Sequence, residues 1–128
     1  MRTRLEGGAC LLFALLLLTL PLPWVVASLS AAAFHELCHI LALMLMRKSI
    51  EEIRIGTRGA QILTSPMGPK EELLCAAAGP LGSLFLLLFL RQLPRLALCA
   101  GVQGLFNLLP LYPMDGGRIL RSLKSFLS

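Results

Sequence analysis

The sequence predicts an all-α membrane protein with about four transmembrane helices, and three observations support this fold class. The 128 residues are 56% hydrophobic and only 15% charged, which is more apolar than a soluble domain of this size. Apolar segments comparable in length to the bilayer thickness recur along the chain. The net charge is +5, but the basic residues gather at the edges of these segments, which argues against a nucleic-acid partner. We therefore expect a single integral membrane domain over residues 1–128.

The predicted spans are an N-terminal helix followed by a three-helix core, at about residues 9–27, 29–46, 73–90 and 96–112. The first segment contains Pro21 and Pro23 towards its end. It could be a cleaved signal peptide, because Arg2 and Arg4 precede it. Cleavage would remove the first half of the next helix, so we favour a retained span.

Two smaller elements complete the predicted fold. Residues 53–55 and 60–63 flank a glycine-containing turn, which is typical of a small β-hairpin, although an ordinary polar loop would also fit. Residues 116–127 form an amphipathic pattern with basic residues on one face. We expect this C-terminal helix to lie on the membrane surface, the alternative being a helix packed on the protein's own core.

The distribution of basic residues predicts the orientation in the membrane. With four spans, the N-terminus, the 47–70 loop and the C-terminus share one side, which holds ten of the twelve basic residues. The other side holds only Arg91 and Arg95. The positive side faces the cytoplasm, so both termini of this multi-pass protein are expected to be cytoplasmic.

The clearest functional signal is the segment His35-Glu36-Leu37-Cys38-His39, which contains the only two histidines of the chain. On a helix, residues four apart share a face, so both imidazoles can reach one metal ion. Glu36 lies close enough to contact a water on that metal. This is the zinc-and-general-base pattern of metalloproteases. The alternative is a pair of packed histidines, but ionisable groups at membrane depth are usually functional.

A catalytic zinc ion needs a third protein ligand. The fourth segment loses helical character near Pro110 and is too short to cross a bilayer, so residues 111–117 must line a polar pocket. Asp115, the only aspartate, lies in that stretch. We favour it over Cys38 or a loop glutamate as the third ligand.

The same residues indicate a peptide hydrolase. Zinc would polarise the scissile carbonyl and acidify its bound water, and Glu36 would take the proton. Asn107 and Gln103 share a face of the fourth segment. Asn107 could hydrogen-bond a substrate backbone or a developing oxyanion. The alternative for both is a hydrogen bond between helices, and for Gln103 neither function is preferred.

Together these motifs resemble the site-2 protease family of intramembrane zinc metalloproteases. The resemblance covers about residues 29–118, and it is carried by His35–His39, Ala78-Gly79-Pro80, Asn107 and Pro113-Met114-Asp115-Gly116. It implies one zinc ion held by His35, His39 and Asp115, with Glu36 as the catalytic base. It further implies that Asn107 and Pro113 contact the unwound substrate. The strands around the glycines resemble the family's small membrane-associated β-hairpin, whose edge can pair with that substrate.

The small size and the ending Asn-Leu-Leu-Pro-Leu-Tyr-Pro-Met-Asp-Gly-Gly-Arg look most like the stage IV sporulation protein FB branch. That branch implies a bacterial cell membrane and a pro-sigma factor cleaved by regulated intramembrane proteolysis during sporulation. Two residues depart from the family pattern. Cys38 stands where Gly is usual and adds bulk beside the metal. Ser83 stands where Asn commonly follows the Gly-Pro motif, which puts a polar contact in doubt.

The expected partners are a transmembrane or membrane-associated protein substrate and the lipid bilayer, with an inhibitory membrane partner as a further candidate. A non-catalytic relative that binds membrane segments is the main alternative function, although the presence of Glu36 argues against it. A metal transporter would have several metal-ligating histidines or carboxylates at successive depths of the membrane, whereas this chain has a single cluster of them.

Overall fold

The computed structural model describes residues 2–5, 7–56, 59–111 and 114–127. Its order of elements is β1 (Arg2–Leu5), α1 (Gly7–Thr19), α2 (Leu22–Leu45), β2 (Ile50–Gly56), β3 (Gly59–Thr64), α3 (Pro69–Phe85), a 3-10 turn η1 (Leu86–Phe89), α4 (Pro94–Asn107) and α5 (Asp115–Leu127). The chain is mostly helical with one small sheet, as the sequence predicts.

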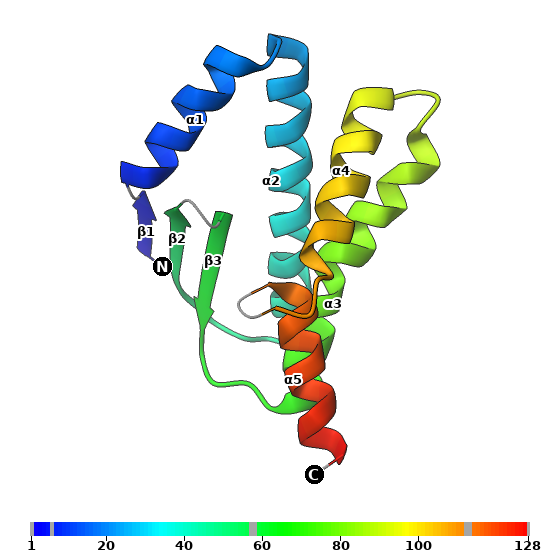
Figure 1. Cartoon of the computed structure of the whole chain (residues 1–128). Coiled ribbons are helices and arrows are strands. Elements are labelled where there is room, and N and C mark those ends of the chain that lie inside the picture. Colours follow the sequence, from blue (N-terminus) through cyan, green and yellow to red (C-terminus); the bar gives the residue numbers. More distant parts are fainter. Residues whose placement is uncertain (1, 6, 57–58, 112–113, 128) are drawn as a thin grey trace.

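Helices α2, α3 and α4 pack against one another, and α5 packs along α3 (Figure 1). Several of the buried residues between these helices have small side chains. Ala31, Ala76 and Ala100 are completely buried. Small residues let helix backbones approach closely where lipid replaces water as the solvent. Many leucines point outwards instead, among them Leu45 and Leu88.

The predicted boundary between the first two spans, near residue 28, is wrong. Helix α1 ends at Thr19, and α2 runs without a break over 24 residues from Leu22. Pro21 is the N-cap of α2, and Pro23 lies in its first turn. Proline disfavours helical backbone in the residue before it, but it fits the first turn of a helix because its missing N–H is not needed there. These prolines therefore start the second helix rather than end the first.

Two stretches in the described part of the chain are long and apolar enough to cross a membrane, Leu22–Leu45 and Pro69–Phe89. Helix α1 has 13 residues and α4 has 14. At 1.5 Å per residue they are about 20 Å long, which is less than the hydrocarbon thickness of about 30 Å. The four-span arrangement therefore stays a prediction.

The predicted hairpin is present as the antiparallel pair β2–β3, with longer strands than expected. Residues 57 and 58 of its turn lie outside the described residues. Strand β1 was not predicted. It pairs in parallel with β2, so that Arg2 lies opposite Glu52. The strand order is β1-β2-β3, so β3 has one unpaired edge. In Figure 1 the sheet lies on the same side of α2 as α1.

Charged contacts join the first turn of α3 to the residues just after α2 and to the middle of α5. Helix α2 closes with Arg47 in the left-handed region at φ 57°, and the backbone N–H of Lys48 donates to the Leu43 carbonyl at 2.9 Å. The Lys48 ammonium then lies 2.8 Å from a Glu71 carboxylate oxygen. On α5, the Arg121 guanidinium donates to Glu72 at 2.6 Å.

Helix α5 occupies the predicted position and packs on the rest of the protein, which is the alternative considered for it. Ser122 is buried on the side that meets the rest of the protein. Leu123 and Phe126, by contrast, are exposed on the apolar face. The helix thus packs on the protein's own core and still presents an apolar surface, as an interfacial helix would.

Candidate metal centre

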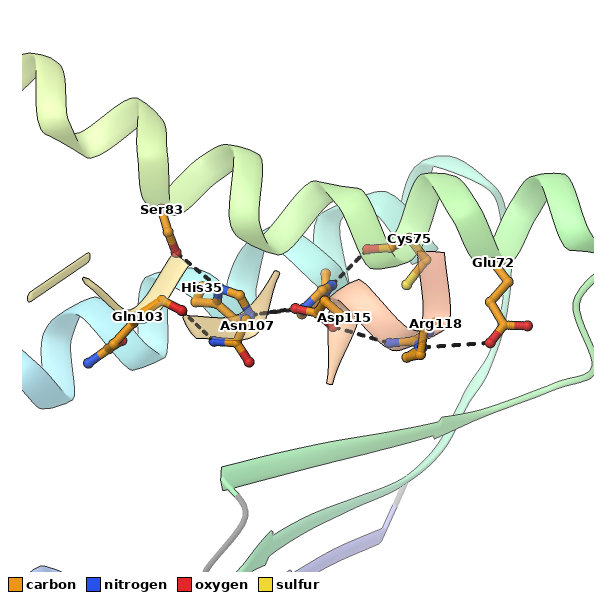
Figure 2. Close-up of polar contacts among 9 residues, drawn as sticks. His35, Glu72, Cys75, Ser83, Gln103, Asn107, Asp115 and Arg118 are labelled. Atoms are coloured by element: carbon orange, nitrogen blue, oxygen red, sulfur yellow. Dashed lines mark hydrogen bonds and ion pairs between the residues drawn. The ribbon is translucent and has the colours of Figure 1, made fainter. Parts of the chain in front are cut away.

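Two elements bring three buried ligands together. His35 and His39 lie one turn apart on α2, and Asp115 is the first residue of α5. The Nε2 atoms of the two histidines are 3.2 Å apart. Asp115 Oδ2 is 2.9 Å from His35 Nε2 and 3.1 Å from His39 Nε2. Figure 2 shows the contact between His35 and Asp115 at the centre of this cluster.

The geometry of these atoms fits a metal ion. Tetrahedral zinc with nitrogen ligands at 2.0–2.1 Å places its ligand atoms about 3.3 Å apart, close to the separations observed. His39 Nδ1 lies 2.7 Å from the Cys75 carbonyl oxygen. A carbonyl only accepts, so Nδ1 carries the hydrogen and a neutral His39 directs its Nε2 lone pair at the cluster. A cation at the centre would satisfy the three electron-rich atoms together.

Helix α3 approaches the two histidines directly through Gly79. A Cβ atom at this position would overlap the His39 ring and lie 2.8 Å from His35 Cε1. Only glycine leaves room for both imidazoles against the helix backbone. Gly79, in the middle of the Ala78-Gly79-Pro80 motif, therefore packs directly on the candidate ligands.

The other residues considered as a third ligand lie elsewhere. The Cys38 thiol faces Gly82, where an added Cβ would overlap its sulfur. This pairing accommodates the extra bulk of Cys38 beside the metal motif. Glu71 and Glu72 form ion pairs with basic side chains. The group of potential ligands found among the described residues consists of His35, His39 and Asp115, all within 4.8 Å of one another.

Asp115 is also connected to its own helix and to α3. Its Oδ1 atom is 3.6 Å from Arg118 Nη1, and Arg118 Nε is 3.7 Å from Glu72 Oε1 (Figure 2). The other carboxylate oxygen of Asp115, Oδ2, faces the two histidines. Gly116 follows immediately, and a Cβ there would overlap the Leu108 carbonyl group. The backbone after α4 is thus packed closely against the start of α5.

The cluster opens into a cavity of about 1780 Å³, which Glu36 and Asn107 also line. Glu36 is half-buried. The Asn107 amide donates to the Gln103 carbonyl at 2.8 Å, and the Gln103 amide donates to the Ser28 carbonyl at 3.0 Å. Gln103 therefore links α4 to α2, which is the structural alternative considered for it. Asn107 lines the cavity, and Pro113 lies outside the described residues.

Sequence reasoning missed two of the contacts that hold the histidines. Ser83 Oγ is 2.9 Å from His35 Nδ1, and the Cys75 carbonyl accepts from His39 (Figure 2). Cys75, Gly79 and Ser83 are spaced four residues apart, so they form one stripe of α3 facing α2. That spacing could have identified Ser83 as a residue on the face of α3 that meets α2. The Cys75 contact uses a backbone carbonyl group, so the residue type at this position does not indicate it.

Comparisons with known proteins identify the family of this chain. The family model described as Peptidase M50B-like matches residues 8–110. The chain is 33% identical over 109 residues to the zinc metalloprotease MJ0392 of Methanocaldococcus jannaschii, covering 74% of this chain and 32% of the relative. It thus spans about a third of the length of that curated relative.

A solved structure gives the same result. The site-2 protease from Methanocaldococcus jannaschii superposes with a TM-score of 0.76 at 27% identity, covering 98% of this chain and 68% of that one. The family match extends over most of the chain and includes both histidines and Asn107. The chain therefore belongs to the site-2 protease (M50B) family of peptidases.

Proposed function

We propose that this protein is a zinc-dependent intramembrane endopeptidase. The observation that carries the proposal is the buried cluster of His35, His39 and Asp115, which opens into a cavity shared with Glu36. Two imidazoles and a carboxylate are a ligand set that suits zinc and leaves one position open for water. The names of the relatives, a zinc metalloprotease and a site-2 protease, support the same chemistry.

Each residue has a definite role in this proposal. His35, His39 and Asp115 hold the metal, which when bound supplies Lewis-acid polarisation of the scissile carbonyl and an acidified water. Glu36 accepts the proton of that water and passes it to the leaving amine. Asn107 lines the cavity, where its side chain can hydrogen-bond the substrate backbone. Pro113 is proposed to orient the substrate beside it.

The substrate we propose is an extended segment of a membrane-embedded or membrane-associated protein. A helical segment must unwind first, because its carbonyl groups are otherwise hydrogen-bonded within the helix. Ile62, Leu63 and Thr64 of β3 line the cavity, and β3 is an edge strand of the sheet. Such an edge can pair with an unwound peptide. A pro-sigma factor in sporulation is the more specific substrate suggested by the resemblance to the sporulation branch.

We further propose that residues 1–128 act as one domain with four membrane segments and cytoplasmic termini, in a bacterial cell membrane. The pairing of β1 with β2 supports one part of this arrangement, because residues 2–5 and 50–56 must lie on the same side to pair. At the opposite end, Arg95 lies 5.9 Å from the Trp24 ring centroid. Tryptophan and arginine together are typical of a membrane interface.

The test is co-expression with a panel of single-span and pro-sigma-type substrates, comparing the parent with Glu36→Gln. We expect product formation to fall by about 10²–10⁴-fold, the usual contribution of a general base. Zinc content should stay at one ion, because Glu36 is not among the proposed ligands. The matched control is Glu51→Gln, which makes the same chemical change at an exposed site and should cleave as the parent does.

Two results would contradict the proposal. Undiminished cleavage by Glu36→Gln would remove Glu36 as the base. A zinc-loaded parent that binds membrane segments and cuts none of them would support the alternative function, a non-catalytic relative that grips its partner.

A further inference from the structure

The two histidines of the cluster are oriented from α3 in different ways. His39 is held by the backbone carbonyl of Cys75, whereas His35 is held by the side chain of Ser83 at 2.9 Å. Ser83 is completely buried. Of these two outer contacts, the one to His35 therefore depends on residue type, and a single substitution can remove it.

The packing around Ser83 fixes its position. Helix α4 covers this serine through Gly104, where an added Cβ would lie 3.0 Å from Ser83 Cβ. Gly79 and Ser83 lie on the same face of α3, with Gly79 against the rings of His35 and His39. An added methyl group at Gly104 would therefore press on the Ser83 side chain. The Ser83 hydroxyl is thus enclosed against His35 Nδ1 (Figure 2).

The direction of this hydrogen bond decides which nitrogen of His35 is available. A serine hydroxyl can donate or accept. If it donated to Nδ1 of a neutral imidazole, Nε2 would carry the hydrogen and could not bind a metal. If it accepts from Nδ1–H, the Nε2 lone pair points towards His39 and Asp115. Metal ligation through Nε2 selects the second arrangement.

We propose that Ser83 is a positioning residue of the metal centre, which accepts a hydrogen bond from His35 Nδ1–H and so fixes the ring with Nε2 facing the metal. This inference rests on the proposed zinc site. It also resolves the doubt raised by serine in place of the common Asn, because the hydroxyl supplies an acceptor at the metal ligand itself. Ser83 acts through His35 and does not contact the metal.

The test measures zinc affinity of the purified full chain in detergent micelles, by competition with a chelator of known affinity. Ser83→Ala should weaken zinc binding by about 10–100-fold, the usual effect of removing an outer partner of a ligand. Cobalt substitution gives a second readout, and the visible absorption of the Co²⁺ form should change in position or intensity. Neither readout depends on cleavage.

The matched control is Ser122→Ala. Ser122 is 3% exposed, and its hydroxyl is buried with no hydrogen-bond partner in the part of the chain that the structure describes. The same atoms are removed there without touching a histidine. This variant should keep the parent's zinc affinity and cobalt spectrum.

The outcomes separate this inference from the proposed function. A parent that binds no zinc would refute the proposed zinc site itself. A parent that binds zinc, together with a folded Ser83→Ala that matches Ser122→Ala in affinity and spectrum, would overturn the role of Ser83 alone. If Ser83→Ala fails to fold, the similar-sized Ser83→Cys carries the same test, because a thiol is a weak acceptor.

Discussion

The cavity has two walls that are built very differently. The helical wall, α2 to α5, holds the candidate ligands with buried hydrogen bonds and close helix contacts. The opposite wall, α1 and the sheet, contacts the helical wall only sparsely, with α1 packing mainly against β2 and α2 (Figure 1). Leu11 and Leu18 of α1 are 74% and 86% exposed. The candidate metal ligands thus lie on the densely packed wall. The loosely packed wall completes the outline of the cavity.

This difference separates metal binding from substrate handling. Every proposed metal ligand and outer contact comes from α2, α3 or α5. Residues of α1 and the sheet line the same cavity but contribute no ligand to the described cluster. Changes in the helical wall should therefore disturb the metal, and changes in the other wall should alter only the fit of a substrate.

The largest expected effect is loss of the metal in Asp115→Ala. Removing one of three ligands from a buried site should reduce bound zinc to background, as measured by metal analysis of the purified protein. The comparison is Leu12→Ala, which trims a cavity-lining residue of α1. It should retain one zinc ion. Equal loss of zinc in both variants would show that the two walls are not independent.

A smaller but clear effect is expected for Gly79→Ala. The added methyl group would overlap the His39 ring, and overpacking of this kind destabilises by about 1–3 kcal/mol. We expect a lower unfolding temperature in micelles and weaker zinc binding. The matched change on the other wall is Gly7→Ala, where a Cβ meets nothing within 4 Å. Similar unfolding temperatures for the two variants would contradict the close approach of α3.

The smallest expected effect concerns Cys38 and Gly82. Gly82→Ala should destabilise the protein because the methyl group meets the Cys38 sulfur, although this side chain can partly move away. Adding Cys38→Gly should relieve the clash. A double-mutant cycle of unfolding free energies should give a coupling of about 0.5–3 kcal/mol, as for residues in contact. A coupling of zero would mean that Cys38 does not face Gly82.

Much of the fold was predictable because its signals are local. The apolar segments, the hairpin around its glycines and the amphipathic tail each have a pattern of their own. The ligand cluster was predictable for a different reason: the chain has only two histidines and one aspartate, so few combinations exist. The structure brings His35, His39 and Asp115 together as expected, and their roles remain proposals.

The features that escaped prediction depend on distant or backbone contacts. The four residues of β1 show no sequence pattern that indicates which strand they pair with. The Cys75 contact uses a carbonyl group that any residue has. The predicted first span ran through Pro21 to about residue 27, because the apolar residues continue past this proline, although a proline there can equally start a helix. Ser83 was noticed only as a departure from a family pattern, since its proximity to His35 arises from helix packing.

The pairing of β1 with β2 also has a consequence for the order of events during synthesis. Arg2 leaves the ribosome long before Glu52, its partner in the sheet. At a synthesis rate of about 5–20 residues per second, the first strand waits seconds for the second to be made. Both α1 and α2 are completed in that interval. The sheet can therefore close only after the residues of α1 and α2 have been synthesised.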